Sequence, residues 1–586
     1  MHRLSAVLLL VCLSGAVPRA QEAMSREQRN ADLETLASWY AKNYGPYEWK
    51  RDALGFDLMR LTPWLQRVHH SDDLDFQEAL IEYVASLNDA HDNIAFPTTY
   101  FISLPMSLDI YDGKVLIDGI NRTLLPLAQF PFGIGDEIVS FDGQPVQLAI
   151  QSLRKYAVSA NPRSTDRTAA SRLVARSQQI MPKIPDVGDT ASVGVRMVST
   201  GETRVYTIAW IKSGIPMLSQ GPLPEPRRGN GRMSLSTDGQ GFEVAPAGAA
   251  ASPSVFQFAD LPKDDTLPAH MEPLRPLLNA SVSKDYYSVL NFGARFPIFA
   301  PPAGFVIRPV PVGTPAFLLS GTYMAGGKRI GFLRIPTMSP PSTTLVLQHL
   351  DQEIAFFNAN TDALVVDVMR NPGGLVSFVE AISQRFMTAP FNIIGFEIRS
   401  TGAWLFSFAS QLNLARATRP PNDPILLNLQ RNFEEVLGAF NENRGRSAPV
   451  SLNATGSLTL DPAAVRYGKP MIVLTDEFSA SGGDMFPAII QDNGRAPLVG
   501  MRTMGAGGSV IGLNCTSYTE SICRITVSLM NRGRLIQTPE YPAAPYIENI
   551  GVRPDIVLDY MTRENLMTAG VPFVQAFTQA LLALVP

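Results

Sequence analysis

The sequence has almost no excess charge, few cysteines and histidines, and no long hydrophobic run. Its 586 residues carry 49 Lys and Arg against 53 Asp and Glu, a net charge of −4. This balance gives no reason to expect nucleic acid or an anionic membrane surface as a partner. The sequence contains neither a C-x-x-C pair nor an H-E-x-x-H motif, so no metal cluster is expected. With 45% hydrophobic residues, a chain of this length predicts two to four domains.

The N-terminus has the pattern of a secretory signal. One Arg precedes an apolar run from Leu4 to Leu13, and small residues follow, with Ser14 and Ala16 in A-x-A spacing and Ala20 as a second candidate cut point. A membrane-spanning helix needs roughly 20 apolar residues, so no membrane span is expected. The sequence predicts an exported protein that loses residues 1–20, and it does not distinguish the periplasm from the extracellular medium.

Removal of this segment leaves two cysteines, Cys515 and Cys523, separated by "TSYTESI". Between two strand-like runs of an exported chain, this spacing suits a disulfide across a hairpin. The alternative is a pair of buried thiols. Export to an oxidising compartment, which the N-terminus predicts, favours the disulfide.

Three regions precede the C-terminal part. Residues 21–98 repeat apolar residues at three and four spacing, as in "DFQEALIEYVASLNDAH", and predict a helical N-terminal domain. Residues 99–212 are strand-like, and "FGIGDEIVSFDGQPV" resembles a PDZ module, with a D-G turn typical of a hairpin. Because PDZ modules commonly bind an extended peptide, this domain implies a polypeptide ligand. Residues 213–303 are rich in Pro, Gly and Ser and predict a linker or insertion; an inhibitory role, or its cleavage on maturation, stays open.

From 304 to 586 strand and helix patterns alternate, for example "DALVVDVM" before "LVSFVEAISQRF" and "PMIVLTD" before "DMFPAIIQDN". Alternation of this kind predicts an α/β layer with mainly parallel strands. Ligand sites in such sheets lie beyond the carboxyl ends of the strands.

Two of these strand ends turn on glycines. "MRNPGGL" places Gly373 and Gly374 at a helix start, and "TDEFSASGGDMF" places Ser481 and Gly482 at another. Bare backbone N–H groups at such starts favour negative charge. A side chain on the turn stands clear of the sheet, as a nucleophile requires. The N–H of Gly482, with one from Gly373 or Gly374, would form an oxyanion hole.

A structural alternative applies to both serines of this turn. Ser479 and Ser481 are residue types that commonly cap helices. Asp484, an acid in the first helical turn, is assigned to the capping role.

A hydroxyl nucleophile needs a base, and histidine is scarce. The mature candidates are His69, His70, His91, His270 and His349. The one in "LNDAHDNIAF" lies where a helix ends before the first strand of the PDZ-like part, a place from which a side chain can reach another domain. His91 is therefore the preferred candidate.

The motifs "VVDVMRNPGG", "VLTDEFSASGGDMF" and "QDNGRAPLVGMRTMGAGG", with the PDZ-like module and "DAH", resemble those of the C-terminal-processing or tail-specific serine peptidases and their tricorn-core relatives. The likeness covers most of the chain except the insertion. In the S-x-S-x-x-[DE] pattern of that family the middle serine is the nucleophile, which matches Ser481. The D-x-H histidine of the family matches His91.

One departure identifies the subtype. The processing peptidases carry a lysine base in a G-K-G loop, but this chain reads Gly505, Ala506 and Gly507. "RTMGAGG" and "YIENIGVRPDIVL" instead resemble the tricorn core and the chlamydial protease-like activity factor, which use Ser, His and Glu. The glutamate of E-N-x-G-V-x-P matches Glu548.

The resemblance implies a multidomain α/β fold with a helical N-terminal domain, a PDZ-like domain and a ClpP/crotonase-like peptidase core. It implies a serine endopeptidase that cleaves polypeptides through an acyl-enzyme, with no cofactor. Dimerisation is consistent with the relatives and not visible in composition. The main alternative is a catalytically silent peptide- or ligand-binding protein on the same fold. An esterase is a second alternative, but "GGDM" lacks the G-x-S-x-G form.

Overall fold

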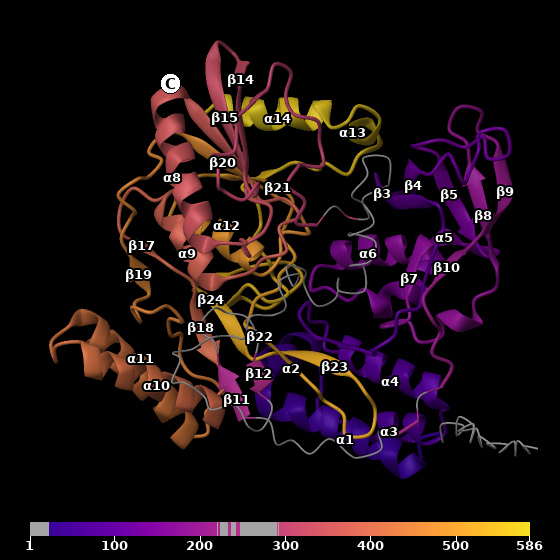
Figure 1. Cartoon of the computed structure of the whole chain (residues 1–586), viewed down its shortest axis with the longest axis horizontal. Helices are drawn as coiled ribbons and strands as arrows, with labels where there is room; N and C mark the ends of the chain where they lie inside the picture. Colours follow the sequence, from indigo (N-terminus) through magenta and orange to yellow (C-terminus); the bar gives the residue numbers. More distant parts are fainter. Residues whose placement is uncertain (1–22, 220, 223–231, 236–241, 246–289, 291) are drawn as a thin grey trace, which may run out of the picture.

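The computed structural model describes residues 23–219, 221–222, 232–235, 242–245, 290 and 292–586. Figure 1 shows three parts: N-terminal helices, a smaller sheet domain beside them, and a larger α/β part that runs to the C-terminus. The predicted signal peptide and most of the predicted insertion lie outside the described residues. Within the described ranges, no helix has the length and apolar character needed to cross a membrane.

The N-terminal part is helical, as its periodicity predicts. Its helices are α1 (Arg26–Asn43), α2 (Tyr47–Leu54), α3 (Thr62–His69) and α4 (Asp73–Ala85). Ser25 and Gln28 start α1 with a capping box, since each side chain accepts a hydrogen bond from the backbone N–H of the other. Asp72 caps α4 by accepting from the N–H of Asp75 at 2.7 Å.

The second part is a sheet domain with the strand order β3-β4-β5-β8-β9, and β6 pairs with β5. Its elements are β3 (Met106–Tyr111), β4 (Lys114–Ile120), β5 (Glu137–Phe141), β6 (Gln144–Pro145), α5 (Val146–Leu153), α6 (Pro162–Val174), β8 (Thr190–Arg196) and β9 (Thr203–Ala209). The predicted D-G hairpin joins β5 to β6, and both turn residues, Asp142 and Gly143, have positive φ, at 46° and 78°. A small sheet of β10 (Ile211–Ser213), β2 (Phe101–Ser103) and β7 (Ala175–Ser177) flanks the domain.

The third part is built on a seven-stranded sheet in the order β13-β14-β15-β16-β20-β21-β26. The strands are β13 (Val306–Ile307), β14 (Leu319–Ala325), β15 (Lys328–Arg334), β16 (Ala363–Asp367), β20 (Met471–Thr475), β21 (Leu498–Gly500) and β26 (Ile556–Val557). From β15 to β26 all neighbours are parallel. The ends of β16 and β20 therefore point the same way and lie side by side.

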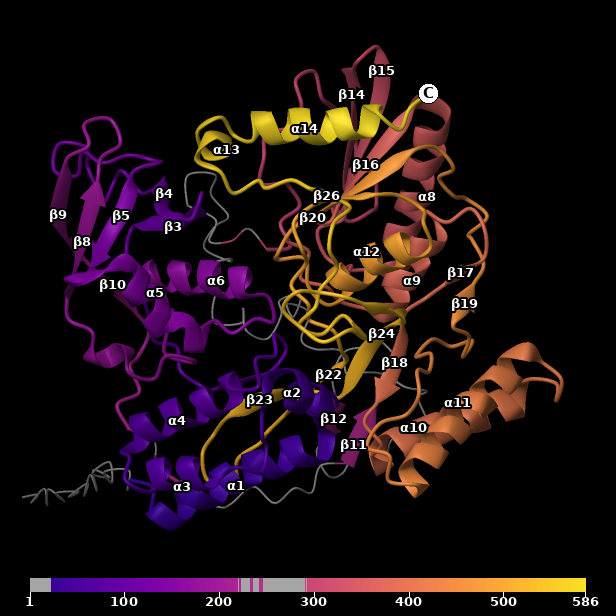
Figure 2. The same cartoon turned by 180° about the vertical axis from the view of Figure 1, so that it is seen from behind.

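Helices cover both faces of this sheet (Figure 2). They are α8 (Thr343–Asn360), α9 (Val376–Gln384), α12 (Gly482–Asp492), α13 (Arg563–Met567) and α14 (Val571–Leu582). Successive residues of β16 point to opposite faces, so Leu364 and Val366 join the core under α8, α9 and α12, whereas Val365 joins the core under α14. Burial on both faces explains why this strand reads as a continuous apolar run.

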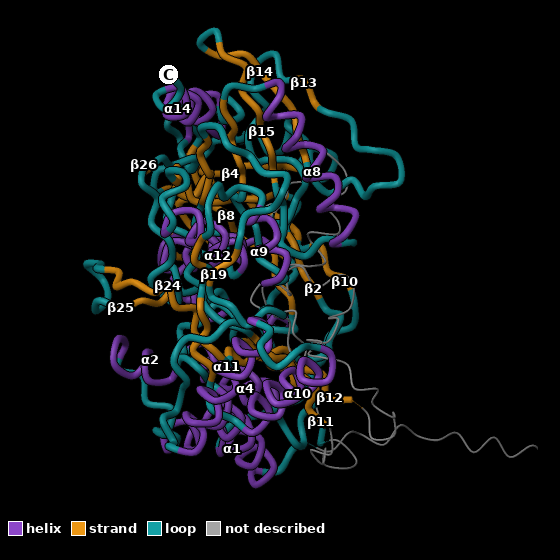
Figure 3. Tube along the Cα trace, turned by 90° about the vertical axis from the view of Figure 1, so that its left-hand side faces the viewer, coloured by secondary structure: helices purple, strands orange, loops and turns teal. Residues whose placement is uncertain are grey.

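Further strands extend the α/β part toward the N-terminal helices. They are β1 (Asn93–Ala95), β22 (Val510–Leu513) and β23 (Ile522–Thr526) in one sheet, β18 (Gly395–Ile398), β24 (Ser528–Ile536) and β25 (Ala544–Tyr546) in another, and the pair β17 (Phe391–Asn392) and β19 (Thr459–Leu460). Because β1 comes from the N-terminal part and pairs with β23, the two parts share a sheet. The side view in Figure 3 places α2 beside β25, where the rings of Trp49 and Tyr546 are 5.4 Å apart.

Two features differ from the sequence expectation. A helical hairpin, α10 (Gly402–Thr418) and α11 (Pro424–Asn441), projects from the α/β part (Figure 1). The predicted insertion ends earlier than 303, because Phe292 and Phe299 are buried in the core. A two-stranded pair, β11 (Arg232–Leu235) and β12 (Phe242–Ala245), also falls within it.

Candidate active site

Ser481 occupies the corner between β20 and α12. Its backbone has φ 54° and ψ −114°, a conformation that side-chain-bearing residues rarely adopt. Holding it costs about 1–3 kcal/mol, which the surrounding contacts must supply. The side chain is partly exposed, although the residues on both sides are buried. The strained corner thus holds this hydroxyl at the surface of the sheet edge, as a nucleophile elbow does.

The second serine of the turn has a structural role. Ser479 is fully buried, and its hydroxyl donates to the carbonyl oxygen of Val368 at 2.9 Å. Since Val368 follows β16, this bond ties the end of β16 to the turn after β20. The structure therefore separates the two serines that the sequence left equivalent.

The Gly373–Gly374 turn packs directly against the serine corner. Asn371 joins the two turns, because its carbonyl oxygen accepts from the N–H of Ala480 at 2.9 Å. A Cβ on Gly373 would lie 2.6 Å from both the Cβ of Ser481 and the backbone nitrogen of Gly482. Gly373 and Gly374 also have φ values of 94° and 141°. Only glycine fits this approach.

The candidate oxyanion donors are not equivalent. The N–H of Gly373 donates to Oδ1 of Asn371 at 2.9 Å, so it is already occupied. Among the described atoms, the N–H groups of Gly374 and Gly482 have no acceptor. These two groups remain as the pair that can bind a developing oxyanion.

Asp484 does more than cap α12. It is fully buried, and its carboxylate accepts from the N–H groups of Ser481 at 2.7 Å, Gly505 at 2.9 Å and Ala506 at 3.1 Å. Burial raises the pKa of Asp484 to about 6, against the effect of these hydrogen bonds. The expected capping role of Asp484 is confirmed, and the same side chain also connects the serine corner to the Gly505–Gly507 loop.

His91 lies in the loop after α4 and is buried, with 4% of its surface exposed. Its backbone N–H donates to Oδ1 of Asp89 at 2.9 Å, and its Nδ1 has no hydrogen-bond partner among the described atoms. Burial lowers the pKa of His91; Asp89 opposes this shift, and Arg524 and Lys50 add to it. These surroundings favour the neutral imidazole, the form that accepts a proton.

The other histidines have different surroundings. His69 and His70 stack edge to face at the end of α3, with ring centroids 4.8 Å apart. His349 is buried in α8, with Nε2 3.6 Å from Glu353. His270 lies outside the described residues. None of the described three contacts the serine corner.

Glu548 is fully buried but bonded to partners other than His91. Its Oε1 accepts from Nζ of Lys50 at 2.5 Å, and its Oε2 accepts from the N–H of Gly507 at 2.9 Å. Burial and the nearby Asp89 carboxylate raise the pKa of Glu548 to about 8, whereas Lys50 acts in the opposite direction. The predicted acid thus lies in the same buried polar cluster as His91, without a hydrogen bond to the imidazole.

The three predicted catalytic residues converge through their neighbours. Ala90, Ala480 and Ala506 belong to one buried cluster, which brings the chain segments next to His91 and Ser481 together. The Gly505–Gly507 loop is bonded to Asp484 at one end and to Glu548 at the other. No hydrogen bond joins the side chains of Ser481, His91 and Glu548 in the described part of the chain; hydrogen bonds between catalytic groups are commonly long or absent before substrate binds.

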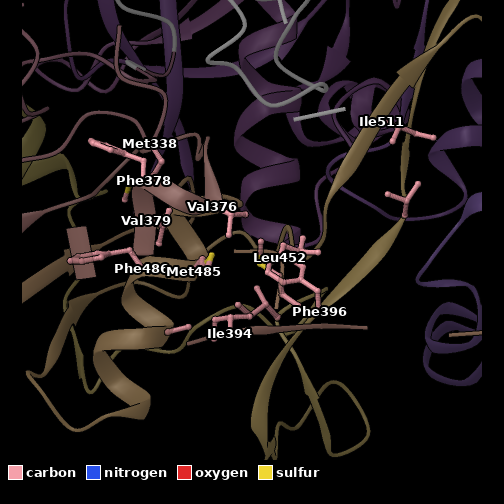
Figure 4. Close-up of a cluster of buried hydrophobic side chains, with 14 of the residues drawn as sticks. Met338, Val376, Phe378, Val379, Ile394, Phe396, Leu452, Met485, Phe486 and Ile511 are labelled. Atoms are coloured by element: carbon pink, nitrogen blue, oxygen red, sulfur yellow. The ribbon is translucent and has the colours of Figure 1, made fainter. Parts of the chain in front are cut away.

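A hydrophobic core supports the serine corner from beneath. Figure 4 shows Met485 and Phe486 of α12 close to Phe378 and Val379 of α9. A Cβ on Gly482 would lie 3.0 Å from Met338, so this core reaches the first residue of α12. Packing of this density holds the two glycine turns in register.

The sheet domain also contacts the serine turn. Arg167 of α6 is buried and bridges Asp109 of β3 to Glu477, which lies four residues before Ser481. Burial raises the pKa of Glu477, but the neighbouring Arg167 and Arg163 outweigh this effect and lower the pKa to about 2. The turn that carries the serine is therefore anchored to the neighbouring domain by a buried ion pair.

The predicted disulfide is not formed in the structure. Cys515 and Cys523 are both free and completely buried. Burial, together with the neighbouring Cys515 thiol, raises the pKa of Cys523 far above its usual range. The two side chains pack as small apolar groups beside each other, as the alternative interpretation had it.

Sequence reasoning missed two residues of the candidate site. Lys50 contacts Glu548, and Asn371 joins the serine turn to the Gly373–Gly374 turn. Lys50 stands next to Arg51 in an amphipathic helix, where a lysine is normally solvated. Asn371 precedes the Pro-Gly-Gly run, and this adjacency to a glycine turn was the one available signal.

Comparison with known proteins matches the fold and two of its domains. Residues 329–558 match the sequence profile of peptidase family S41, and residues 100–217 match that of a PDZ domain. The chain therefore carries an S41 peptidase domain and a PDZ domain, and its class is that of the serine-type peptidases. The family resemblance drawn from the motifs is confirmed.

Individual relatives extend over nearly the whole chain. A protein of Chlamydia trachomatis is 27% identical over 592 residues, which cover 95% of this chain and 93% of that protein. The crystal structure of mature CPAF superimposes with a TM-score of 0.71 at 21% identity, covering 95% and 97% of the two chains, and shows that the fold is shared. Carboxyl-terminal-processing peptidase 3 of Arabidopsis thaliana is 27% identical over 161 residues, 26% of this chain and 27% of that protein.

Proposed function

We propose that this protein is an exported serine endopeptidase that cleaves polypeptides with Ser481, His91 and Glu548. The observation that carries the proposal is the serine corner. A strained, partly exposed Ser481 lies against a glycine turn, and the N–H groups of Gly482 and Gly374 have no acceptor among the described residues. This arrangement suits acyl transfer, in which a hydroxyl attacks a carbonyl whose oxygen becomes negative.

In the proposed mechanism, Ser481 Oγ attacks the peptide carbonyl and His91 takes its proton. His91 then gives the proton to the leaving amine, and water hydrolyses the acyl-enzyme by the same path. Glu548 stabilises the imidazolium. The unpartnered Nδ1 of His91 is the atom that the carboxylate would bind once substrate draws the site together.

The test is hydrolysis of casein by the wild type and by Ser481→Ala, His91→Ala and Glu548→Ala, together with labelling by a fluorophosphonate probe. We expect the wild type to cut and to be labelled. The Ser481 and His91 variants should lose at least about 10³-fold in kcat, and the Glu548 variant about 10²-fold or more. Labelling that survives Ser481→Ala would contradict the assignment. A wild type that neither cuts nor reacts would favour the binding-protein alternative.

Export and assembly are separate parts of the proposal. The apolar run and small residues of the N-terminus support removal of a signal segment. N-terminal sequencing of the secreted protein would locate the cut after Ala16 or Ala20. A homodimer, consistent with the family resemblance, would sediment at twice the 63.9 kDa chain mass, less the signal segment.

A further inference from the structure

Lys50 of α2 is a lysine with none of its surface exposed. Its ammonium group donates to the carbonyl oxygen of Asn88 at 2.8 Å, to Oε1 of Glu548 at 2.5 Å and to Oδ1 of Asn549 at 2.8 Å. A lysine has three N–H donors, so all of them are used. The ammonium group is thus held in a single position.

Stability alone does not explain such a group. Removing an ammonium from water costs several kcal/mol, and replacing a buried ion pair by apolar side chains is often neutral or stabilising. Lys50 and Glu548 are both fully buried, so this cost applies to each of them. Buried charge pairs of this kind cluster at functional sites.

The contacts of Lys50 join two loops that the proposed chemistry needs. Asn88 lies three positions before His91, and Glu548 and Asn549 lie in the loop that supplies the acid. Asn549 donates from Nδ2 to the same Asn88 carbonyl oxygen at 2.9 Å, which closes the arrangement. The ammonium group of Lys50 and the side chain of Asn549 therefore both fix the loop before His91 relative to the loop that carries Glu548.

We propose that Lys50 is a positioning residue for the proposed Ser481–His91–Glu548 triad: its ammonium group holds Glu548 and the loop before His91 beside each other. This inference rests on the proposed function. Lys50 itself does not touch the serine corner in the described contacts, so it acts through Glu548 and Asn88.

The surroundings of Glu548 explain why a cation is needed there. The charged and titratable groups that face this cluster are Tyr44 directly after α1, Lys50 of α2, Asp89, His91 and Asp92 of the loop after α4, and Arg524 of β23. Burial and Asp89 both favour the protonated form of Glu548. Without Lys50 the carboxyl would stay neutral to higher pH and could not stabilise an imidazolium.

The experiment compares Lys50→Met and Lys50→Gln with the wild type, using kcat and KM for casein-derived peptides from pH 6 to 10. Met removes the charge at similar length, and Gln retains N–H donors for Asn88 and Asn549, which guards against loss of folding. We expect kcat to fall by about 10²-fold while KM changes by less than about 3-fold. The acid limb of the kcat/KM profile should move to higher pH, since the pKa of Glu548 rises when Lys50 is lost.

Trp49→Phe is the matched control. The Nε1 of Trp49 donates to Oδ1 of Asn549 at 3.0 Å, so this variant removes a hydrogen bond to the same loop without removing a charge. We expect a small change in kcat and an unmoved pH profile. Both Lys50 variants and the control are checked for folding by circular dichroism before kinetics.

Two outcomes would overturn the inference while the proposed function stands. In one, the Lys50 variants retain wild-type kcat and the wild-type pH profile, or match Trp49→Phe. In the other, kcat rises, which would make Lys50 a restraint on Glu548. A wild type that is inert toward both casein and the fluorophosphonate probe would instead remove the proposed function, and with it the triad that Lys50 positions.

Discussion

The two sides of the candidate site are built differently. On the nucleophile side, Ser481 and the Gly373–Gly374 turn follow adjacent parallel strands of one sheet and are joined by backbone bonds and close packing. On the base side, His91, Glu548 and Lys50 come from separate loops and a helix, and charged side chains connect them. The geometry of the nucleophile side depends on close steric fit, and that of the base side depends on which groups are ionised.

This difference predicts two kinds of failure. Substitutions on the nucleophile side should act by steric conflict, with little dependence on pH. Substitutions on the base side should change how activity depends on pH, because they alter which groups carry charge.

The largest effect is expected from Gly373→Ala. The new Cβ would lie 2.6 Å from the Cβ of Ser481, at a φ of 94° that alanine does not tolerate. We expect kcat and the rate of fluorophosphonate labelling both to fall by at least about 10³-fold across the whole pH range. Gly468→Ala is the control, because a Cβ there meets no atom within 4 Å. Equal activity of the two variants would show that the turns are not in rigid contact.

Glu548→Gln should have the next largest effect. The amide keeps the size of the side chain but cannot be ionised, and it leaves Lys50 as an unpaired buried charge. We expect kcat to fall by about 10²–10³-fold. The wild-type kcat/KM should rise with pH as Glu548, with its pKa raised to about 8, loses its proton. That rise should be absent from the variant; a profile that keeps it would assign the ionisation to another group.

A smaller loss is expected from Asp484→Asn. Oδ2 of Asp484 accepts from the N–H groups of Ser481 and Ala506, and an amide NH₂ in its place would face donors. We expect the free energy of unfolding to fall by about 1–3 kcal/mol and kcat by about 10-fold, measured by urea unfolding and hydrolysis. Asp423→Asn, at the partly exposed cap of α11, is the control, since asparagine caps equally well. Indistinguishable unfolding of the two variants would contradict the role given to Asp484.

The smallest effect on activity is expected from Glu380→Gln in α9, a buried glutamate without a cation. Among the described residues its one side-chain hydrogen bond comes from Nδ2 of Asn453 at 3.5 Å, and burial raises the pKa of Glu380 to about 8. Because the folded-state pKa exceeds the unfolded value of 4.5, this group stabilises the wild type fully below pH 4.5, and the stabilisation is lost as pH rises through about 8.

We therefore expect the wild type to lose roughly 2–4 kcal/mol of stability relative to Glu380→Gln between pH 5 and pH 9, with kcat unchanged. Thermal unfolding across this range measures the difference. Parallel stability curves for the two proteins would mean that Glu380 is ionised in the folded state.

Sequence patterns predicted the nucleophile side well and the base side poorly. The apolar runs of β16 and β20, followed by glycines, were sufficient to place Ser481 and both turns. The sequence could not show which N–H groups are free to bind an oxyanion. The N–H of Gly373 donates to Asn371, and this hydrogen bond depends on how the turn folds. Lys50 could not be identified for a similar reason, because the hydrogen-bond partners of this buried lysine, Asn88, Glu548 and Asn549, are distant from it in the sequence.

The separation of the base-side residues along the chain has a consequence for biosynthesis. Lys50 and Glu548 are 498 positions apart, so a ribosome exposes the first of them long before the second. Until the segment with Glu548 has been synthesised, the growing polypeptide lacks the proposed acid, its hydrogen bond with the N–H of Gly507, and strand β26. Contacts of such long range also form late in folding. The proposed centre is therefore incomplete until Glu548 has been synthesised, and a chain that stops before this residue is expected not to cleave itself.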